Sequence, residues 1–375
     1  MLVPLVDLAA QEAAIRDDVL AEIEKIAKAG TFILGSPVER FERWLAETCG
    51  VRSAVGVASG TDAIELGMRA LGIGPGDAVV TPAFAFVAPA EAIVATGARP
   101  LFCDVDAETL CVSAQSVADA VARGRHLGLS VKAVVPVDLF GACSPMSELR
   151  DFAKREGLAL VEDAAQAFGA RDAGGVIAGA AGDVGCFSFF PTKPLGAWGD
   201  GGAVITNDET VAHRVRRLRA HGAIVPYVHP ETGRNSRLDA VQAAVLWVKA
   251  GHLSSWHTAR CDIAERYVDG LGGLPLILPK ILPFPSVHAW HAFVVRVGDN
   301  CRDALAAWLE KCGIATRIYY PVPLHRQPCF RGLDEPPCPN AERACQTALA
   351  LPMSAALTSN HTDIVIRAIR TFFDG

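Results

Sequence analysis

Lys193 lies in a sequence context that is unusual for a lysine. It follows the aromatic run Phe187–Phe190, which is predicted to be a strand, and it precedes a turn flanked by glycines between positions 196 and 202. Lysine is rarely left among apolar neighbours for structural reasons. Desolvation and nearby positive charge favour its neutral amine, which can form a Schiff base with an aldehyde. Taken alone, the segment fits a lysine on a surface loop equally well.

A carboxylate is predicted at the end of a buried strand. The apolar run Leu158–Val161 is followed directly by Glu162 and Asp163, and open α/β sheets bind ligands at the carboxyl ends of their strands. A poorly solvated carboxylate there needs a cationic partner to stay ionised, and a protonated pyridine nitrogen is one such partner. For Asp163 considered by itself, capping of a helix is the alternative.

The segment Ser59–Ala63 (SGTDA) is a candidate anion site. It lies between a predicted strand and a helix that opens near Ala63. Gly60 permits close approach, and backbone N–H groups and the Thr61 hydroxyl point outward at a helix N-terminus, which suits a phosphate. An ordinary N-cap, with Thr61 or Asp62 as the capping residue, explains the same residues.

The hydrophobic pattern predicts the elements that must position these three segments. Apolar residues recur at steps of three and four in the first fifty residues, which indicates two amphipathic helices. Short apolar runs then alternate with helical stretches, as is typical of buried parallel strands joined by crossover helices. The glycine-rich stretch Gly72–Asp77 follows a helix and precedes a strand, the reverse of a dinucleotide motif, so it is predicted to be a turn. The predicted strands are Ala54–Val57, Ala78–Val80, Arg99–Cys103, Lys132–Val137 and Leu158–Val161.

A second, smaller domain is predicted in the C-terminal third. We expect an α/β domain with a mainly parallel sheet over residues 1–250 and a small α+β domain over residues 251–375. The Pro/Gly-rich segment Gly270–Pro285 is a candidate hinge, and two helical segments close the chain. The other predicted elements are helices at Val241–Lys249, Ala259–Tyr267 and Asp303–Lys311 and strands at Trp290–Val297 and Ala315–Tyr319.

The composition is that of a globular protein without a membrane segment. Hydrophobic residues make up 51% and charged residues 20% of the 375 residues, and no apolar run is long enough to span a bilayer. No export signal is recognised at the start, so a cytoplasmic location is expected. The eleven cysteines show neither a CxxC pair nor a Cys/His ligand spacing, so reduced thiols and no metal are expected. The net charge of −6 and dispersed basic residues, apart from His213–Arg219, argue against a nucleic-acid partner.

An anion site, a strand-end carboxylate and a lysine thirty positions later match, in that order, the fold-type I pyridoxal-phosphate enzymes. Over essentially its whole length the chain resembles the sugar-nucleotide aminotransferase family of DegT/StrS type. The resemblance lies in PLVDLAAQ at Pro4, FILGSPVERFE at Phe32, SGTDA at Ser59, GPGDAVVTPAFAFVA at Gly74, VEDAAQAFGA at Val161, FSFFPTKPLGAWGDGGAV at Phe187, NSRLDAVQAAVL at Asn235 and YYPVPLHRQP at Tyr319.

The resemblance implies that several of these residues bind pyridoxal phosphate (PLP). Lys193 would hold the cofactor covalently and move protons, and Asp163 would partner its pyridine nitrogen. Gln166 would hydrogen-bond the ring hydroxyl, and Phe86 would stack on the ring, with a core aromatic as the alternative for Phe86. The phosphate would be held by Gly60, Thr61 and Ser188, with Asn235 reaching it from the other subunit of a homodimer.

On the substrate side, the resemblance points to Arg237 and to the segment 319–325. Tyr319, Tyr320 and His325 would lie near the sugar or the carboxylate of the amino donor. Arg237 would meet an anionic group of the substrate or belong to a structural ion pair. Many relatives have histidine in place of Tyr319 and asparagine in place of Pro194, which leaves the substrate position and the keto carbon open.

The reaction implied is transamination of a nucleotide-linked keto sugar. An amino acid, expected to be glutamate, would convert PLP to pyridoxamine phosphate, and the sugar would then take the amine in a ping-pong cycle. By resemblance only, the YYPVPLH and NSRLD segments favour amination at carbon 3. Lys193 separates the chain from relatives that dehydrate deoxysugars, which have histidine there. The alternatives are a regulatory protein that keeps the fold without turnover and another class of PLP enzyme, such as an amino-acid lyase.

Overall fold

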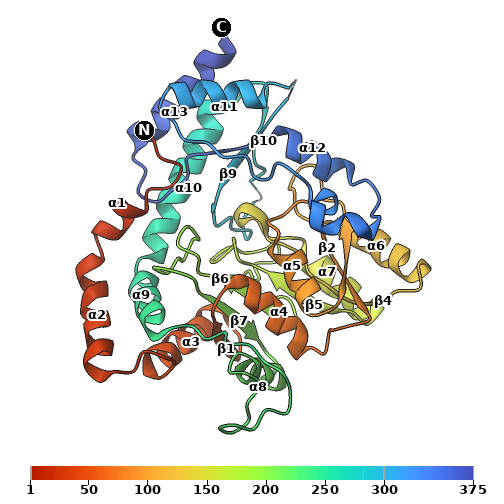
Figure 1. The fold of residues 1–375 in the computed structure, drawn as a ribbon. Helices are drawn as coiled ribbons and strands as arrows, with labels where there is room; N and C mark the ends of the chain where they lie inside the picture. The colour runs from red at the N-terminus through yellow and green to blue at the C-terminus, as the bar shows by residue number, and fades with distance from the viewer. Residues whose placement is uncertain (1, 282, 299, 375) are drawn as a thin grey trace.

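The computed structural model describes residues 2–281, 283–298 and 300–374. A seven-stranded sheet forms the centre of the large α/β part, and a three-stranded sheet lies in the C-terminal part of the chain (Figure 1). The strands of the large sheet are β1 (Ser53–Val57), β2 (Asp77–Pro82), β3 (Arg99–Cys103), β4 (Ser130–Val134), β5 (Ala159–Asp163), β6 (Val184–Ser188) and β7 (Gly202–Thr206).

The large sheet is mainly parallel, as predicted. Its strand order is β1-β7-β6-β5-β4-β2-β3. Parallel pairing joins β3, β2, β4, β5 and β6, whereas β7 runs antiparallel to both of its neighbours, β6 and β1. All strands except β7 therefore point the same way. The segments that follow β1, β2, β5 and β6 meet at one edge of the sheet as a consequence.

Helices cover both faces of this sheet because both faces are apolar. Successive residues of a strand point to opposite faces. In β2, Val79 packs on the side of α4, α5 and α8, whereas Ala78 and Val80 pack on the side of α6 and α7. The pair α3 and α9 completes the second face beside β1 and β7. The helices are α1 (Leu8–Ala13), α2 (Arg16–Ala29), α3 (Ser36–Cys49), α4 (Gly60–Ala70), α5 (Ala88–Ala95), α6 (Ala114–His126), α7 (Met146–Glu156), α8 (Glu209–Leu218) and α9 (Ala240–Ala250).

The C-terminal part surrounds an antiparallel sheet of order β10-β9-β8. The predicted strand at Ala315–Tyr319 is wrong, because Arg317 forms only an isolated bridge to Ala350. The apolar run Ala348–Leu351, which the sequence analysis did not identify, supplies the partner of β9 instead. No helix in the described part of the chain is both long and apolar enough to cross a membrane. The elements are α10 (Leu253–Leu271), β8 (Leu276–Ile277), β9 (Phe293–Val297), α11 (Arg302–Lys311), α12 (Pro339–Thr347), β10 (Ala348–Leu351) and α13 (Ser359–Asp374).

Two segments pack against the part of the molecule to which they do not belong in sequence. Val3 forms a bridge with Ile314 and lies in the C-terminal core. Leu324 and Phe330 pack instead with core residues of the large part. The division at residue 250 therefore stays a prediction. The candidate hinge Gly270–Pro285 contains β8, and its position 282 lies outside the described residues.

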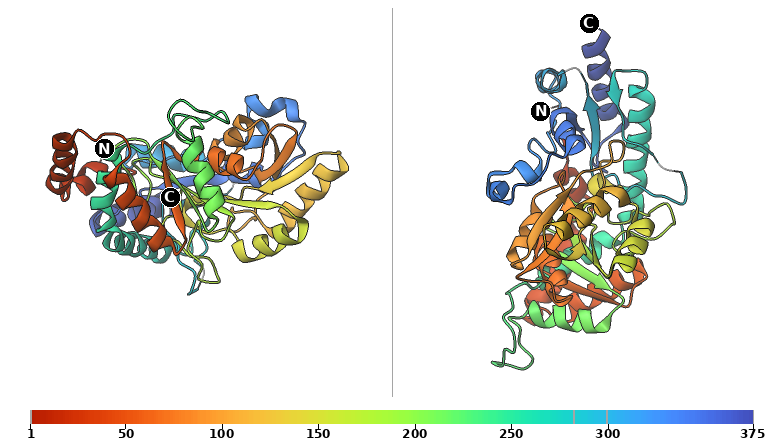
Figure 2. Two further views of the ribbon diagram at one scale, coloured as in Figure 1. Left: turned by 90° about the horizontal axis from the view of Figure 1, so that it is seen from below. Right: turned by 90° about the vertical axis from the view of Figure 1, so that its right-hand side faces the viewer.

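A hairpin between α8 and α9 projects from the end of the large part that lies away from the C-terminal sheet (Figure 2). Antiparallel bridges join Ala220 to Asn235 and Val225 to Val228. Tyr227 near its tip is 95% exposed, and three aliphatic neighbours are exposed as well. Clustered exposed apolar side chains mark an interaction surface.

Candidate active site

Most of the predicted cofactor residues line one cavity of about 600 Å³ at the carboxyl edge of the large sheet. Its walls come from the segments that follow β1, β2, β4, β5 and β6, and from His291 and residues 318–320 of the C-terminal part. The sheet topology thus brings together segments that are more than a hundred residues apart in the chain. The predicted cofactor residues in the lining are Gly60, Thr61, Phe86, Asp163, Gln166, Ser188 and Lys193.

The turn from β1 into α4 forms a cradle of backbone N–H groups. Ser59 is extended and caps the helix, since its hydroxyl accepts a hydrogen bond from the Asp62 N–H at 3.1 Å. The predicted capping by Thr61 or Asp62 is therefore wrong. The helix begins at Gly60, so the first N–H groups of α4 lack partners within the helix. A Cβ at Gly60 would lie 2.6 Å from the Ser188 Cβ, so only glycine lets β6 approach this closely.

Lys193 and Asp163 form the charged centre of the cavity. Burial lowers the pKa of Lys193 to about 8, and the negative charge of Asp163 opposes this shift. Burial also raises the pKa of Asp163 to about 6, against the hydrogen bond from the Ala165 N–H and the charge of Lys193. Above pH 6 the carboxylate of Asp163 is therefore mostly ionised. The neutral amine of Lys193 predominates only above about pH 8.

The structure decides two alternatives that the sequence left open. Residues 164–170 form turns rather than a helix, so Asp163 does not cap a helix. Lys193 is half-buried and lines the cavity, so it does not lie on an outer surface loop. Two hydrogen bonds shape its loop, from the Lys193 N–H to the Phe190 carbonyl at 2.8 Å and from the Ala197 N–H to the Phe189 carbonyl at 2.7 Å.

Aromatic rings form much of the remaining wall. Tyr320 stacks on Phe140 with ring centroids 6.3 Å apart, and Phe86 lies at the same distance from Tyr320. Gln166 fixes this wall, because its Oε1 accepts from the Phe140 N–H at 2.9 Å and its Nε2 donates to the Tyr320 hydroxyl at 3.2 Å. Phe86 is 54% exposed, so it is not a core aromatic, and its ring is open to a flat ligand.

Three predicted residues lie outside the cavity lining of the single chain. Asn235 is exposed and Arg237 is half-buried, and both belong to the segment that links the projecting hairpin to α9. His325 is buried, and its Nε2 lies 2.9 Å from the Glu342 Oε1 of α12. The structure therefore does not bring Asn235, Arg237 or His325 to the other candidate residues within one chain.

His291 is a lining residue that the sequence analysis did not identify. Burial lowers the pKa of His291 well below its usual range, and the charge of Lys193 lowers it further. Its Nδ1 is buried without a hydrogen-bond partner in the described part of the chain. A lone histidine before an apolar strand gives no such signal in the sequence. Thr192, Asp200, Phe140 and Ile318 were missed as well.

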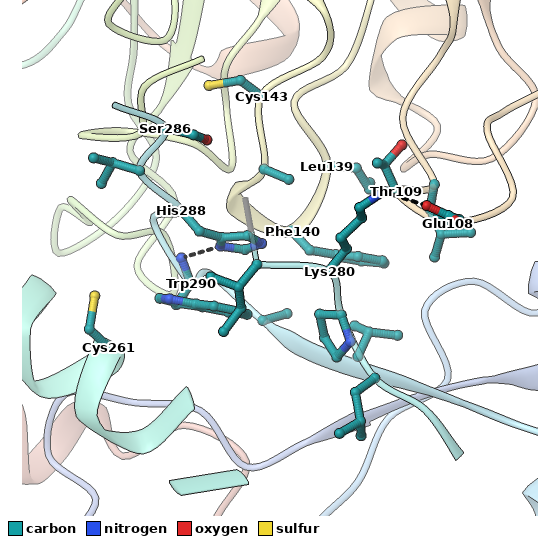
Figure 3. A pocket seen from close by; sticks show the side chains of 18 of the residues that line it. Glu108, Thr109, Leu139, Phe140, Cys143, Cys261, Lys280, Ser286, His288 and Trp290 are labelled. Carbon is teal, nitrogen blue, oxygen red and sulfur yellow. Dashed lines mark hydrogen bonds and ion pairs between the residues drawn. The ribbon is translucent and has the colours of Figure 1, made fainter. Parts of the chain in front are cut away.

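A second cavity, of about 320 Å³, lies between residues 108–143 of the large part and residues 257–296 of the C-terminal part. Figure 3 shows Lys280 at its rim, paired with Glu108 at 2.5 Å. His288 stacks on Trp290 beside it, with ring centroids 3.8 Å apart. Phe140 lines both cavities, but none of the predicted site residues lines this one.

Comparison with known proteins assigns the family. The model of the DegT/DnrJ/EryC1/StrS aminotransferase family matches residues 13–370. The chain belongs to this family. Its similarity to the UDP-N-acetyl-3-dehydro-α-D-glucosamine 3-aminotransferase of Acidithiobacillus ferrooxidans is 40% identity over 373 residues, covering 100% of this chain and 98% of the relative. A pleiotropic regulatory protein of Geobacillus stearothermophilus is 39% identical over 379 residues, covering 100% and 99%.

A solved structure of the family superposes closely on this member. The crystal structure of DesV from S. venezuelae in complex with a ketimine intermediate gives a TM-score of 0.94 at 40% identity and covers 100% of this chain and 99% of its own. The family and this neighbour confirm the fold type, the aminotransferase class and the PLP cofactor.

The residues of the cavity fit PLP. The glycine-dependent cradle at α4 suits its phosphate, a buried carboxylate suits its protonated ring nitrogen, and a lysine of lowered pKa suits its aldehyde.

Proposed function

We propose that this DegT/DnrJ/EryC1/StrS family member transfers an amino group from an amino acid, expected to be glutamate, to carbon 3 of a nucleotide-linked keto sugar. The observation that carries the proposal is that Lys193, Asp163 and the α4 N-terminus line a single cavity. The relative from Acidithiobacillus, named for 3-amination of a UDP-linked sugar, supports the substrate class. The two half-reactions follow a ping-pong order in this proposal.

Each side chain of the cavity is assigned a separate role in the reaction. When bound, PLP supplies an aldehyde that condenses with amines and a ring that withdraws electrons from the neighbouring carbon. Lys193 would hold the cofactor through its amine and would move a proton to and from the substrate carbon. Asp163, ionised above pH 6, keeps a proton on the pyridine nitrogen. Gln166 orients the ring hydroxyl, and Phe86 covers the ring.

The phosphate is assigned to the N-terminus of α4 and the end of β6. In this proposal the Gly60 and Thr61 N–H groups and the Ser188 hydroxyl bind it, because the N-terminus of α4 carries partial positive charge. These groups converge where β1 and β6 end, beside the antiparallel strand β7. The phosphate therefore anchors one end of the cofactor, while Lys193 holds the other.

The substrate is assigned to the aromatic wall. Tyr319 and Tyr320 line the cavity and are proposed to position the sugar or the carboxylate of the donor. Arg237 of the neighbouring chain is proposed to contact an anionic group of the substrate. His325 is proposed to support segment 319–325 from behind through Glu342, because its ring lies away from the cavity.

A homodimer with shared sites completes the proposal. Asn235 is exposed beside a hairpin with apolar residues at its tip, and it would reach the phosphate of the partner subunit. Coexpression of Lys193→Ala with Asn235→Trp tests this, because a mixed dimer then has one doubly defective site and one intact site. If about half of the dimers are mixed, about a quarter of all sites regain activity. Activity of purified mixed dimers at parental levels contradicts the shared site.

A regulatory protein without turnover is the second candidate, and the Geobacillus relative named as a pleiotropic regulatory protein favours it. The presence of Lys193, Asp163 and Gln166 argues for turnover. The test is to reconstitute the protein with PLP and follow the visible band of the lysine-bound cofactor. Its loss with glutamate, and its return with one of a panel of nucleotide-linked keto sugars, supports the transaminase and names its substrate. A band that no amino acid removes supports the regulatory protein.

The cytoplasm is the proposed location. Cys103, Cys111 and Cys186 are buried free thiols, as is usual for a protein of a reducing compartment. Fractionation of producing cells alongside marker enzymes tests this, and recovery with the markers of an oxidising compartment contradicts it.

A further inference from the structure

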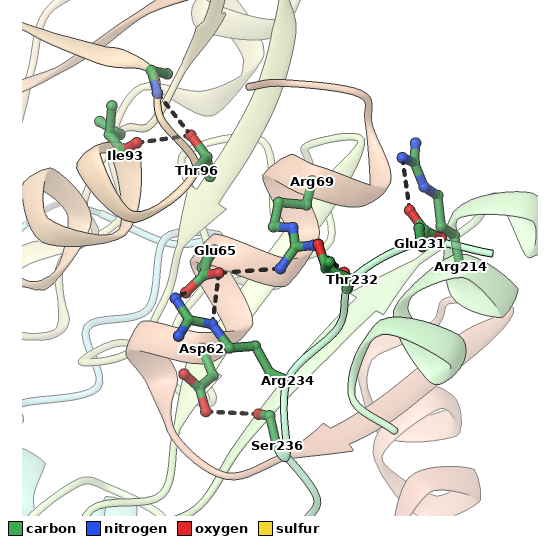
Figure 4. Close-up of polar contacts among 11 residues, drawn as sticks. Asp62, Glu65, Arg69, Ile93, Thr96, Arg214, Glu231, Thr232, Arg234 and Ser236 are labelled. Atoms are coloured by element: carbon green, nitrogen blue, oxygen red, sulfur yellow. Dashed lines mark hydrogen bonds and ion pairs between the residues drawn. The ribbon is translucent and has the colours of Figure 1, made fainter. Parts of the chain in front are cut away.

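Asn235 is held between two residues that are tied to α4. On one side, Arg234 donates from Nε and Nη2 to the two carboxylate oxygens of Glu65, at 3.0 and 2.9 Å. On the other side, the Ser236 hydroxyl donates to Asp62 Oδ2 at 2.7 Å. Figure 4 shows both side chains reaching the same helix. The exposed Asn235 therefore has anchored neighbours on either side.

Two of these groups, Glu65 and Ser236, are buried, whereas the Arg234 side chain is 49% exposed. The Glu65 side chain is only 5% exposed and accepts two hydrogen bonds from the same guanidinium, the geometry that best orients an arginine. Ser236 is fully buried, and its hydroxyl also accepts from the Ala58 N–H at 3.1 Å. Ala58 directly precedes Ser59, the cap of α4. The anchors thus bracket the Gly60–Thr61 cradle itself.

Helix α4 therefore contacts both the cavity and the segment 234–236. Its first N–H groups face the cavity of its own chain, and its side chains at 62 and 65 hold the segment 234–236. We propose that Asp62, Glu65, Arg234 and Ser236 are positioning residues that aim Asn235 at the phosphate site of the partner subunit. This inference rests on the proposed homodimer with shared sites. In a twofold dimer, each phosphate then depends on its own α4 and on the α4 of the partner.

The first test measures PLP affinity in homodimers from the absorbance of the lysine-bound cofactor. Arg234→Gln and Ser236→Ala are each expected to weaken PLP binding about ten-fold, the effect of one misplaced hydrogen bond to a charged group. Glu231→Gln is the matched control, because Glu231 ties the same hairpin to Arg214 and Arg217 but lies farther from Asn235. Less than about a two-fold change is expected there. Equal weakening by Glu231→Gln would mean that the whole hairpin sets the affinity, and the proposal fails.

A double-mutant cycle tests whether Arg234 and Glu65 act as one unit. Glu65→Gln is expected to weaken PLP binding as Arg234→Gln does, and the double variant is expected to be no weaker than either single one, because residues in direct contact are not additive. Additive losses would overturn a shared positioning role. Thermal unfolding and size-exclusion profiles accompany each variant, and Ser236→Ala carries the test if an arginine variant fails to fold.

Mixed dimers distinguish positioning across the interface from support of the chain's own cradle. An Arg234→Gln chain is paired with a Lys193→Ala chain, so only the Arg234→Gln chain gives the visible band. In the proposed dimer, the phosphate site of the Arg234→Gln chain contacts Asn235 of the Lys193→Ala chain. In that second chain Arg234 and Ser236 are unchanged. The proposal predicts wild-type PLP affinity at this site. Affinity as weak as in the Arg234→Gln homodimer would mean that the anchors act within their own chain, which overturns it.

One further variant distinguishes a failure of the shared site from a failure of the positioning role. Asn235→Trp in a homodimer is expected to weaken PLP binding at least as much as Arg234→Gln. If Asn235→Trp has no effect, the shared site of the proposed function fails. If Asn235→Trp weakens binding and Arg234→Gln does not, the shared site stands and only the positioning role is lost.

Discussion

Each of the two cavities has a lysine, and the two lysines differ in their surroundings. Lys280 is half exposed at its rim and forms an ion pair with Glu108, which raises the pKa of Lys280. Lys193 lies inside its cavity, and burial lowers its pKa to about 8. The carboxylate near Lys193 belongs to Asp163, which is itself buried and reduces this shift without cancelling it.

The surroundings of a lysine, rather than the residue type alone, decide whether its amine is reactive. Water and a direct ion pair keep the amine of Lys280 protonated, whereas desolvation makes the amine of Lys193 available as a nucleophile. The rest of the chemistry follows the same division. The N-terminus of α4 and a buried carboxylate line the cavity of Lys193 at the sheet edge, whereas neither lines the cavity of Lys280.

The largest expected effect comes from removing the reactive amine. Lys193→Ala is expected to abolish turnover while leaving a folded dimer that still binds PLP noncovalently, because one amine holds the cofactor and moves the proton. Borohydride reduction followed by mass spectrometry should find no cofactor attached to this variant. Lys280→Ala is the control and should be labelled as the wild type is. Normal labelling of Lys193→Ala would remove Lys193 from the mechanism.

The next effect comes from the carboxylate beside it. Asp163→Ala is expected to weaken PLP binding and to lower kcat by several orders of magnitude, beyond the roughly 10² to 10³-fold typical of one lost stabilising contact. The reason is that the pyridine nitrogen then lacks the charge that keeps it protonated. Single-turnover kinetics with saturating PLP measures this effect. Near-native turnover would show that Asp163 has only a structural role.

The pKa difference between the two lysines predicts a pH profile. The rate at which the apoenzyme captures PLP should rise about ten-fold per pH unit below pH 8 and level off above it, because the neutral fraction of Lys193 grows as pH passes its pKa of about 8. Absorbance traces between pH 6 and 10 measure this rate. A break near 10.5, the ordinary value of lysine, would contradict the lowered pKa.

The smallest effect is expected at the second cavity. Lys280→Ala removes an exposed ion pair with Glu108, and such pairs contribute little to stability. Turnover is expected to stay at the wild-type level, and the unfolding midpoint to move by no more than about 2 °C. Steady-state kinetics and calorimetry check both. A loss of turnover comparable to that of Asp163→Ala would assign this cavity a part in the reaction.

Local patterns predicted the positions of two candidate residues of the large part. Asp163 and Lys193 were placed at strand ends from their apolar flanks, and the sheet brings both into one cavity. The same reasoning was wrong for Ala315–Tyr319, since the partner of β9 is Ala348–Leu351. Strand pairing over fifty residues leaves no mark in the pattern of either strand alone.

The amino-acid sequence was sufficient to recognise the family and its fold type through the resemblance of its motifs. It also placed Asp163 and Lys193 next to apolar strands, because that placement depends on periodicity over short distances. Only the tertiary structure placed His291 beside Lys193, turned His325 toward Glu342 and anchored Arg234 on Glu65. The last contact joins residues 169 positions apart. Such contacts arise when the sheet and its helices close, because burial then makes each polar group depend on whichever partner the fold brings near.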